Sequence, residues 1–222
     1  RNQFQIINVE LLKGVQKFQL LDTNTKKLYS FSTSLSGKHN IYNLCAAICV
    51  ALEEKISIAD IKKGLKNFKG VGRRFETEQI AISNQPKILI DDYGHHPTEI
   101  LVTIKAIKEK FPKKRILMIF EPHRYSRTKQ LLKDFIKVLL KVDQLVLLDI
   151  YPASEKPMRG ISSSRLMDEI NQQKGNAINL SNDHAIEWIT TNYKEFDILV
   201  TQGAGTISQL NNSLKEKWAL KK

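Results

Sequence analysis

Apolar and polar residues alternate along the first part of the chain with the two-residue period of half-buried β-strands. FQIINVELL (4–12), KFQLLD (17–22) and KLYSFSTSL (27–35) carry this pattern. The polar segment TNTKK lies before the last of them and is typical of a turn. The pattern predicts β structure from residue 1 to about residue 36, with an antiparallel hairpin.

From Asn40 onward the apolar residues recur every three or four positions instead, which is the period of an amphipathic helix. They are Ile41, Leu44, Cys45, Ile48 and Leu52. A second helix is predicted in SIADIKKGLKNF (57–68), with Ser57 as its N-cap and Asp60 three residues later. KGVGRRFE (69–76) then interrupts the pattern with two glycines and two arginines. This interruption predicts a boundary between two structural units, residues 1–72 and 73–222.

After this boundary, short apolar runs alternate with helical stretches. The predicted strands are 87–90, 115–120, 144–150, 177–180 and 197–201. The predicted helices are about 97–111, 128–142, 162–174, 183–193 and 205–217, with Pro97 at a first helical position and Asp183 as an N-cap. Strands that are apolar throughout indicate a mostly parallel sheet covered on both faces. With right-handed crossovers the prediction is a doubly wound, Rossmann-like α/β domain.

Composition narrows the class of protein. The 222 residues are 41% hydrophobic, enough for one large domain or for one domain and part of another. No apolar run approaches the roughly 20 residues that a membrane span needs, and the first residues do not resemble a signal peptide. We therefore expect a cytoplasmic protein without a membrane partner.

Charge and cysteine content exclude two further kinds of site. The net charge of +12 is spread over the polar faces of several predicted helices, and no helix-turn-helix or zinc-finger spacing occurs. We therefore predict no nucleic-acid partner, only a preference for anionic small molecules. The two cysteines, Cys45 and Cys49, share one face of a predicted helix. This spacing suits packing, and no metal site is predicted.

The candidate chemistry follows the strands. Four predicted strands are followed by DDYGHHPTE (91–99), EPHRYSRT (121–128), YPASEKPMRG (151–160) and QGAGT (202–206). Ligands of open α/β sheets bind beyond the carboxyl ends of the strands. We therefore expect these segments to form one ligand-facing rim.

Two arginine pairs are candidate anion ligands. Arg124 and Arg127 lie three residues apart at a predicted loop-to-helix junction. Cations there oppose the helix dipole, which favours binding of a carboxylate or phosphate over a solvated surface pair. Arg73 and Arg74 are candidates for a phosphate-bearing ligand, with linker charges as the alternative.

The other segments leave more alternatives open. QGAGT offers free N–H groups to an anion, although so short a glycine motif is weak on its own. In DDYGHHPTE, the alternative to a functional histidine pair is a turn followed by a helix cap. Neither G-x-x-x-x-G-K-[ST] nor the G-x-G-x-x-G fingerprint occurs.

The motifs taken together resemble a known family. GKHNIYNLCAAICVA, GVGRRFE, DDYGHHPTEI, EPHRYSRT, YPASEKPMRGIS and QGAGTI, in this order and spacing, resemble the Mur ligases, and within them the UDP-N-acetylmuramate–L-alanine ligases. The resemblance covers essentially the whole chain. It implies that residues 1–72 are the incomplete end of the family's central ATP-binding domain and that residues 73–222 are its C-terminal domain.

The resemblance also implies an activity in peptidoglycan and cell-wall synthesis. ATP, with Mg²⁺, activates the carboxylate of UDP-N-acetylmuramate as an acyl phosphate, and L-alanine attacks it to form an amide. The family holds ATP and Mg²⁺ mainly through an upstream region with a phosphate-binding loop. That loop is absent from these residues, so the isolated chain is expected to be inactive.

Site residues carry over from the family by position. The resemblance implies that the alanine side of the site, including the groups that act in catalysis, consists of Tyr93, His95, His123, Arg124 and Arg127. It implies that the nucleotide side consists of Asn40 and then Asn43 near the adenine, Arg74 or Arg73 on the nucleotide, and Asp92 near the ribose.

Two other functions remain open from the sequence. One is a related ligase of the same family that attaches a recycled tripeptide. The other is a non-catalytic, anion-binding α/β module, basic enough to meet nucleic acid. Amino-acid-dependent ATP hydrolysis would distinguish the first alternative, and salt-dependent retention on DNA would identify the second.

Overall fold

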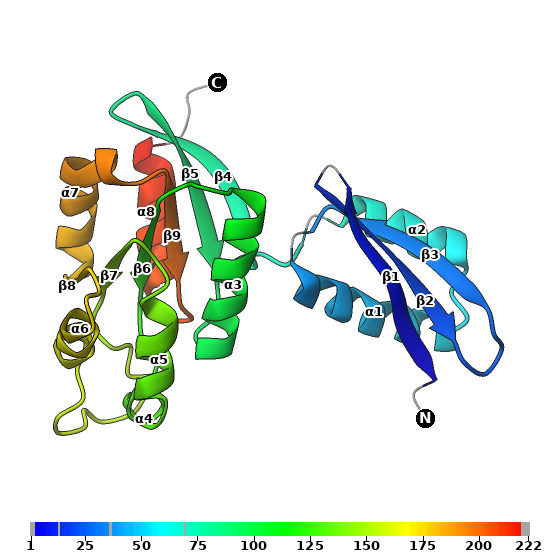
Figure 1. The fold of residues 1–222 in the computed structure, drawn as a ribbon, viewed down its shortest axis with the longest axis horizontal. Helices are drawn as coiled ribbons and strands as arrows, with labels where there is room; N and C mark the ends of the chain where they lie inside the picture. The colour runs from blue at the N-terminus through cyan, green and yellow to red at the C-terminus, as the bar shows by residue number, and fades with distance from the viewer. Residues whose placement is uncertain (1–2, 13, 36, 69, 219–222) are drawn as a thin grey trace. The chain divides into compact units, whose positions relative to one another are not determined.

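The computed structural model of the chain describes residues 3–12, 14–35, 37–68 and 70–218. It divides into two compact units, residues 1–71 and 72–222 (Figure 1). Residue 69, at the start of the predicted boundary segment, lies outside the described residues. The division therefore falls within the glycine-rich segment.

The first unit contains a three-stranded antiparallel sheet. Its strands β1 (Phe4–Leu12), β2 (Val15–Asp22) and β3 (Leu28–Thr33) lie in the order β1-β2-β3, with an irregularity between Ile7 and Glu10. Alternate residues of β2 and β3 are buried, as the two-residue period predicts. The β structure predicted here is confirmed, with three strands.

Two helices cover one face of this sheet. In α1 (Lys38–Glu53), the residues Ile41, Leu44, Cys45 and Ile48 are buried. They join Phe18, Leu20 and Phe31 of the strands in one core. The second helix, α2 (Ile58–Asn67), begins as predicted, because the Ser57 side chain accepts a hydrogen bond from the Asp60 N–H at 3.1 Å.

The second unit is built on a six-stranded sheet in the order β4-β5-β9-β6-β7-β8. The strands are β4 (Glu76–Ile82), β5 (Gln85–Asp92), β6 (Ile116–Phe120), β7 (Gln144–Leu147), β8 (Ala177–Asn179) and β9 (Ile198–Gln202). All neighbours pair in parallel except β4, which is antiparallel to β5. The doubly wound, mostly parallel sheet predicted from the sequence is confirmed, and β4 is an additional strand that the sequence analysis missed.

Helices cover both faces of this sheet (Figure 1). One face packs against α3 (Pro97–Lys110), α5 (Leu132–Leu139) and α6 (Ser163–Gln172). The other packs against α7 (Asn182–Asn192) and α8 (Ile207–Trp218). Between these two helices the chain passes through the short turn η1 (Tyr193–Glu195) and β9, which lies in the middle of the sheet. The central strands β9, β6 and β7 are almost entirely buried, which explains why they are mostly apolar.

Two helix boundaries differ from the prediction. The helix predicted at 128–142 is two helices, α4 (Tyr125–Gln130) and α5, which meet at Leu131. Asp183 is not an N-cap. Ser181 occupies that position and its hydroxyl contacts the His184 ring at 2.9 Å, so Asp183 lies in the first turn, where its charge still favours the helix dipole. Pro97 lies at the first helical position as predicted.

Candidate functional site

The segments after β5, β9 and β6 meet at one edge of the second unit, because these three strands are neighbours in the sheet. The Gly203 N–H donates to the Asp92 carbonyl at 3.0 Å, and the Glu121 N–H donates to the Gln202 carbonyl at 3.1 Å. The rim expected from the sequence is therefore a continuous, hydrogen-bonded surface.

Four aromatic rings form a row along this rim. The ring of Tyr93 meets that of His95 edge-on, with centroids 5.5 Å apart. His95 and His123 are 5.3 Å apart, and so are His123 and Tyr151. Three different loops contribute these rings, which lie together although they are far apart in the sequence. Tyr151 was not singled out from the sequence; its only signal was its place directly after a predicted strand.

The two adjacent histidines, His95 and His96, have different contacts in the structure. The Glu99 carboxylate accepts from the His95 N–H at 2.8 Å and from the His96 N–H at 3.0 Å. The His96 ring accepts from the Thr98 N–H at 3.2 Å and caps α3. Burial alone would raise the pKa of Glu99, but these backbone bonds, with His95 and Arg74 nearby, lower it. His96 therefore serves the helix, while His95 faces His123.

Arg127 lies directly against His123. Its Nη1 atom is 3.3 Å from the His123 Nδ1 atom and 3.3 Å from the His123 carbonyl oxygen. Burial, together with the positive charge of His95, Arg127 and Arg124, lowers the pKa of His123. The imidazole of His123 therefore stays neutral to a lower pH than a free histidine does, and its unprotonated nitrogen can accept a hydrogen bond.

Arg124 is held at the start of α4 by the segment after β7. Its N–H donates to the Tyr151 carbonyl at 2.8 Å, and its Nε atom lies 4.0 Å from Glu155. The Glu155 carboxylate also accepts from the Ser126 N–H at 2.9 Å. Half of the Arg124 side chain stays exposed, so its guanidinium remains available to an anion. Glu155 was missed in the sequence, where it is one carboxylate among many.

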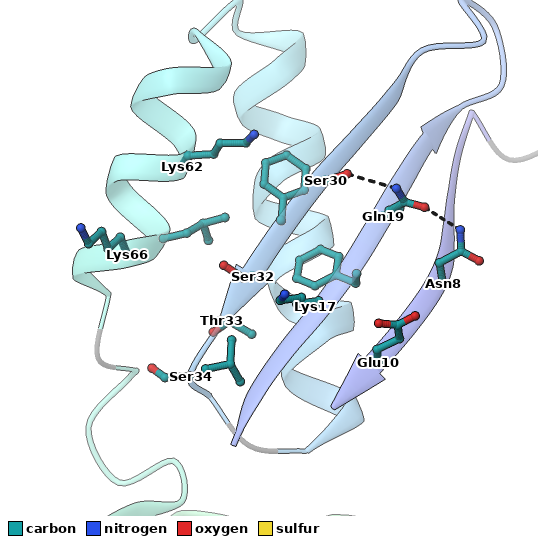
Figure 2. Close-up of a pocket in the computed structure, with 14 residues that line it drawn as sticks. Asn8, Glu10, Lys17, Gln19, Ser30, Ser32, Thr33, Ser34, Lys62 and Lys66 are labelled. Atoms are coloured by element: carbon teal, nitrogen blue, oxygen red, sulfur yellow. Dashed lines mark hydrogen bonds between the residues drawn. The ribbon is translucent and has the colours of Figure 1, made fainter. Parts of the chain in front are cut away.

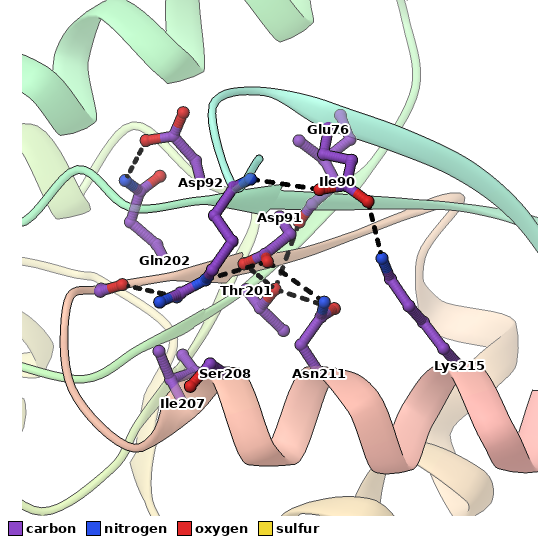
Figure 3. A network of polar contacts seen from close by, with 12 residues as sticks. Glu76, Ile90, Asp91, Asp92, Thr201, Gln202, Ile207, Ser208, Asn211 and Lys215 are labelled. Atoms are coloured by element: carbon purple, nitrogen blue, oxygen red, sulfur yellow. Dashed lines mark hydrogen bonds and ion pairs between the residues drawn. The ribbon is translucent and has the colours of Figure 1, made fainter. Parts of the chain in front are cut away.

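The buried carboxylate of Asp91 forms an ion pair with the half-buried side chain of Arg73, and Figure 3 shows Asp91 among its polar neighbours. The Arg73 Nε atom donates to the Asp91 carboxylate at 3.0 Å. Thr201 and Asn211 donate to the same carboxylate at 3.0 and 3.2 Å. Burial raises the pKa of Asp91, and the opposing charge of Arg73 offsets only part of that effect. Arg73 is thus bonded to other residues of the second unit. Arg74 is exposed, and its guanidinium carbon lies 5.4 Å from the centroid of the Tyr93 ring.

Asp92, the predicted ribose contact, is also engaged. One of its oxygens accepts from the Gly94 N–H and from the Gln202 side chain at 2.9 and 2.7 Å. The other accepts from the Phe75 N–H at 3.0 Å. Only 6% of Asp92 is exposed, so a ribose contact would have to replace one of these bonds. The crowding also explains Gly94, where an added Cβ would lie 2.7 Å from both Asp92 and Gln202.

The end of the QGAGT segment meets an anion of the protein itself. The buried carboxylate of Glu121 accepts from the Ile207 N–H at 3.1 Å and from the Thr206 hydroxyl, at the start of α8. The protein thereby satisfies this helix end with its own anion. Glu121 is the first residue of EPHRYSRT. Nothing in the sequence around it indicates that it binds the start of α8, which lies far along the chain.

The predicted adenine ligands lie in the first unit. Asn40 and Asn43 are in the first turns of α1, where Asn40 is half-buried and Asn43 is exposed. The same unit carries a groove of about 810 Å³ over its sheet (Figure 2). Asn8, Gln19 and Ser30 form a row of side-chain hydrogen bonds there. The described lining of this groove includes none of the predicted site residues.

Two further properties of the described residues concern metal sites and membrane-spanning helices. Within residues 3–12, 14–35, 37–68 and 70–218, no three histidine, cysteine, aspartate or glutamate side chains gather as a metal site would require. In the same part of the chain, no helix combines the length and the apolar character needed to cross a membrane.

Comparison with known proteins agrees with this architecture. Residues 73–205 match the model of a family described as Mur ligase, glutamate ligase domain. The UDP-N-acetylmuramate–L-alanine ligase of Psychrobacter arcticus is 38% identical over 214 residues, covering 91% of this chain and 45% of the relative. The chain thus spans about half the length of the curated relatives that it matches.

Two solved structures share the fold. The UDP-N-acetylmuramate–alanine ligase of Thermotoga maritima superposes with a TM-score of 0.77 and 21% identity, covering 98% of this chain and 46% of that one. A murein peptide ligase from Psychrobacter arcticus gives a TM-score of 0.69 at 22% identity, with 96% and 44% covered. Since both identities are low, these two likenesses establish the fold alone.

Proposed function

The chain belongs to the Mur ligase family, and from this premise we propose that it forms the amino-acid side of a ligase. The ligase joins L-alanine to the carboxylate of UDP-N-acetylmuramate in peptidoglycan synthesis, with hydrolysis of ATP to ADP and phosphate. The observation that carries the proposal is the rim at which Arg127 contacts His123 beside His95 and Tyr93.

The chemistry of the rim suits an amino acid. Arg124 and Arg127 present planar guanidiniums, which bind a carboxylate through two parallel hydrogen bonds. The acceptor nitrogen of the neutral His123 ring already faces Arg127 and so orients that arginine. His95 donates through its Nδ1 atom to the Tyr93 carbonyl, so its Nε2 atom can accept a hydrogen bond from the amine. Tyr93, with 37% of its surface exposed, closes one end of the row of rings. We assign the carboxylate of alanine to the arginines and its amine to the side of the histidines.

The reaction then depends on positioning and charge. When bound, ATP supplies the phosphoryl group that activates the sugar carboxylate, and Mg²⁺ neutralises phosphate charge. Attack of the alanine nitrogen on the acyl carbon forms the amide bond, expels phosphate and releases one proton. The arginines hold the amino acid and stabilise the negative charge that develops. His95 accepts a hydrogen bond from the attacking nitrogen, while His123 orients Arg127.

The nucleotide side is supported by fewer residues. Exposed Arg74 fits a phosphate or ribose contact, whereas Asp92 and Arg73 already have partners inside the protein. The described residues contain no cluster of histidine, cysteine or carboxylate side chains that fits Mg²⁺. The phosphate-binding loop and the metal ligands would come from a polypeptide region like that of the longer relatives.

The first unit supports this view of an incomplete ATP-binding domain. Nine of the eleven large hydrophobic residues described as exposed belong to it, although it is the smaller unit. This concentration of exposed apolar side chains fits a unit that lies against further polypeptide. We assign residues 1–72 to the end of the ATP-binding domain and residues 73–222 to the C-terminal domain. We expect the isolated chain to lack ligase activity.

The test is an activity assay. The chain is joined to the first half of the Psychrobacter arcticus ligase, and ADP release is followed with UDP-N-acetylmuramate and one acceptor at a time. Release that depends on L-alanine supports the proposal, and the intact relative serves as the positive control. Release that depends on the tripeptide instead supports the recycling ligase. The absence of acceptor-dependent release, with salt-sensitive retention of the isolated chain on DNA, supports the non-catalytic anion-binding module.

A further inference from the structure

The two arginines of GVGRRF occupy different environments. The Arg73 side chain is 23% exposed and its guanidinium is bonded on two sides, by Asp91 at 3.0 Å and by the Gly203 carbonyl at 2.7 Å. Arg74 is exposed, and no ion pair of Arg74 occurs among the residues that the structure describes. Both guanidiniums lie near the Tyr93 ring, at 5.5 and 5.4 Å.

Arg73 also fixes the backbone on which Tyr93 sits. The Arg73 carbonyl accepts a hydrogen bond from the Tyr93 N–H at 2.7 Å. The Arg73 N–H in turn donates to the Glu76 carboxylate at 3.1 Å, and its backbone adopts a left-handed conformation with φ of 56°. One residue therefore holds Tyr93 from both its main chain and its side chain, in a backbone conformation that most residues avoid.

The partner of Arg73 is itself immobile. Asp91 is 2% exposed and accepts from Thr201 on β9 and from Asn211 on α8 (Figure 3). A buried carboxylate with this many donors has one position. Because the guanidinium of Arg73 bonds to Asp91 and to Gly203, it ties the end of β5 to the turn after β9.

We propose that Arg73 and Asp91 are a positioning pair for the amino-acid site. Arg73 sets the ring of Tyr93 and the turn at Gly203 without touching a ligand. A lysine at position 73 keeps the charge, but a single ammonium group cannot reproduce the planar fork that joins Asp91 to Gly203 while facing the Tyr93 ring. The consequence for alanine rests on the proposed function, whereas the positioning itself does not.

Amide hydrogen exchange on the 222-residue chain tests the positioning directly. In Arg73→Lys we expect the Tyr93 and Gly203 amides to exchange at least about tenfold faster than in the wild type, as local opening becomes easier. Arg74→Lys is the matched control, since it changes the adjacent arginine at the same ring without touching Asp91 or Gly203. Unchanged exchange in Arg73→Lys, or an equal acceleration in Arg74→Lys, would overturn the proposal.

A second variant covers the case in which Arg73→Lys does not fold. Asp91→Asn keeps the size and one acceptor of the side chain but removes the charge that Arg73 bonds. It should accelerate exchange at the same two amides, and Asp91→Asn spectra with both amides still protected as in the wild type would count against the pair.

Kinetics of the joined ligase separate positioning from ligand contact. In Arg73→Lys the KM for alanine should rise about tenfold while the KM for ATP stays within about twofold, and Arg74→Lys should show the reverse. A rise in the KM for ATP in both variants would make Arg73 a nucleotide ligand and refute the assignment. If the parent shows no turnover with alanine, the proposed function fails, and the exchange experiment still decides the positioning.

Discussion

Gly205 lets the turn after β9 pack closely against Tyr151 and Glu121, so its replacement by alanine is predicted to destabilise the second unit. A Cβ atom at this position would lie 2.5 Å from the Tyr151 Cγ atom, 2.8 Å from the Tyr151 Cβ atom and 2.5 Å from the Glu121 carboxylate. Carbon atoms in ordinary contact are about 3.5–4.0 Å apart, so the shortfall is about 1 Å. The substitution Gly205→Ala therefore requires a neighbour to move.

The two neighbours of Gly205, Tyr151 and Glu121, cannot move easily. The Tyr151 backbone donates to the Pro122 carbonyl and accepts from the Arg124 N–H, both at 2.8 Å. Overpacking of this kind costs about 1–3 kcal/mol, and we take about 2 kcal/mol, the middle of that range. Displacing Glu121 would weaken its bond to the Ile207 N–H, which adds about 1 kcal/mol. We expect Gly205→Ala to lose about 3 kcal/mol of unfolding free energy.

Urea unfolding followed by tryptophan fluorescence measures this loss. The only two tryptophans of the chain, Trp188 and Trp218, are both in the second unit, so the signal reports that unit. A loss of about 3 kcal/mol corresponds to a fall in Tm of about 6–12 °C for a domain of this size. The control is Gly72→Ala, where an added Cβ meets nothing within 4 Å. A Gly205→Ala variant that loses under about 1 kcal/mol would refute the packing argument.

Three further predictions concern the site residues and the first unit. The His123 ring should titrate below its ordinary pKa of 6.5, and Arg127→Met should raise that midpoint by removing a nearby positive charge. Because the pKa of His123 is lower in the folded than in the unfolded wild-type chain, the unfolded chain binds the proton more readily. The contribution of His123 to stability is therefore complete above pH 6.5 and falls as the pH drops towards the folded pKa. An NMR titration midpoint of His123 at or above 6.5 would contradict the lowered pKa. In the joined ligase, Arg127→Lys should lower kcat/KM for alanine about 100-fold through loss of bidentate geometry, and unchanged kinetics would remove Arg127 from the site. Burial raises the pKa of the Cys45 thiol to about 11, so a disulfide reagent at pH 8 should label Cys45 slowly until the chain is unfolded, and labelling at the rate of a free thiol would contradict that burial.

The main features of the fold follow from local patterns in the sequence. Buried parallel strands are apolar along their whole length, and each ligand-facing loop must follow a strand, so the positions of Tyr93, His95, His123 and Arg127 could be assigned to one edge. The strand β4 was not predicted, because ETEQIAI is polar at its first four positions. Its pairing with β5 depends on the turn at Ser83 and Asn84. An edge strand that is covered on fewer sides has a weaker apolar signal.

The side chains that hold the site together were harder to find. Glu121 caps a helix that begins far along the chain, and Asp91 pairs with an arginine from a segment before β4. Such bonds are decided by the sheet order, which no short window of sequence contains. For the same reason, the sequence alone could not show that Arg73 is engaged and Arg74 is exposed.

The row of rings from Tyr93 to Tyr151 has a consequence for damaged or heat-stressed protein. Its members come from loops that become neighbours only after β5, β9, β6 and the segment following β7 have assembled. The complete row therefore exists only in the assembled sheet, and unfolding of the sheet separates the three loops that carry its rings.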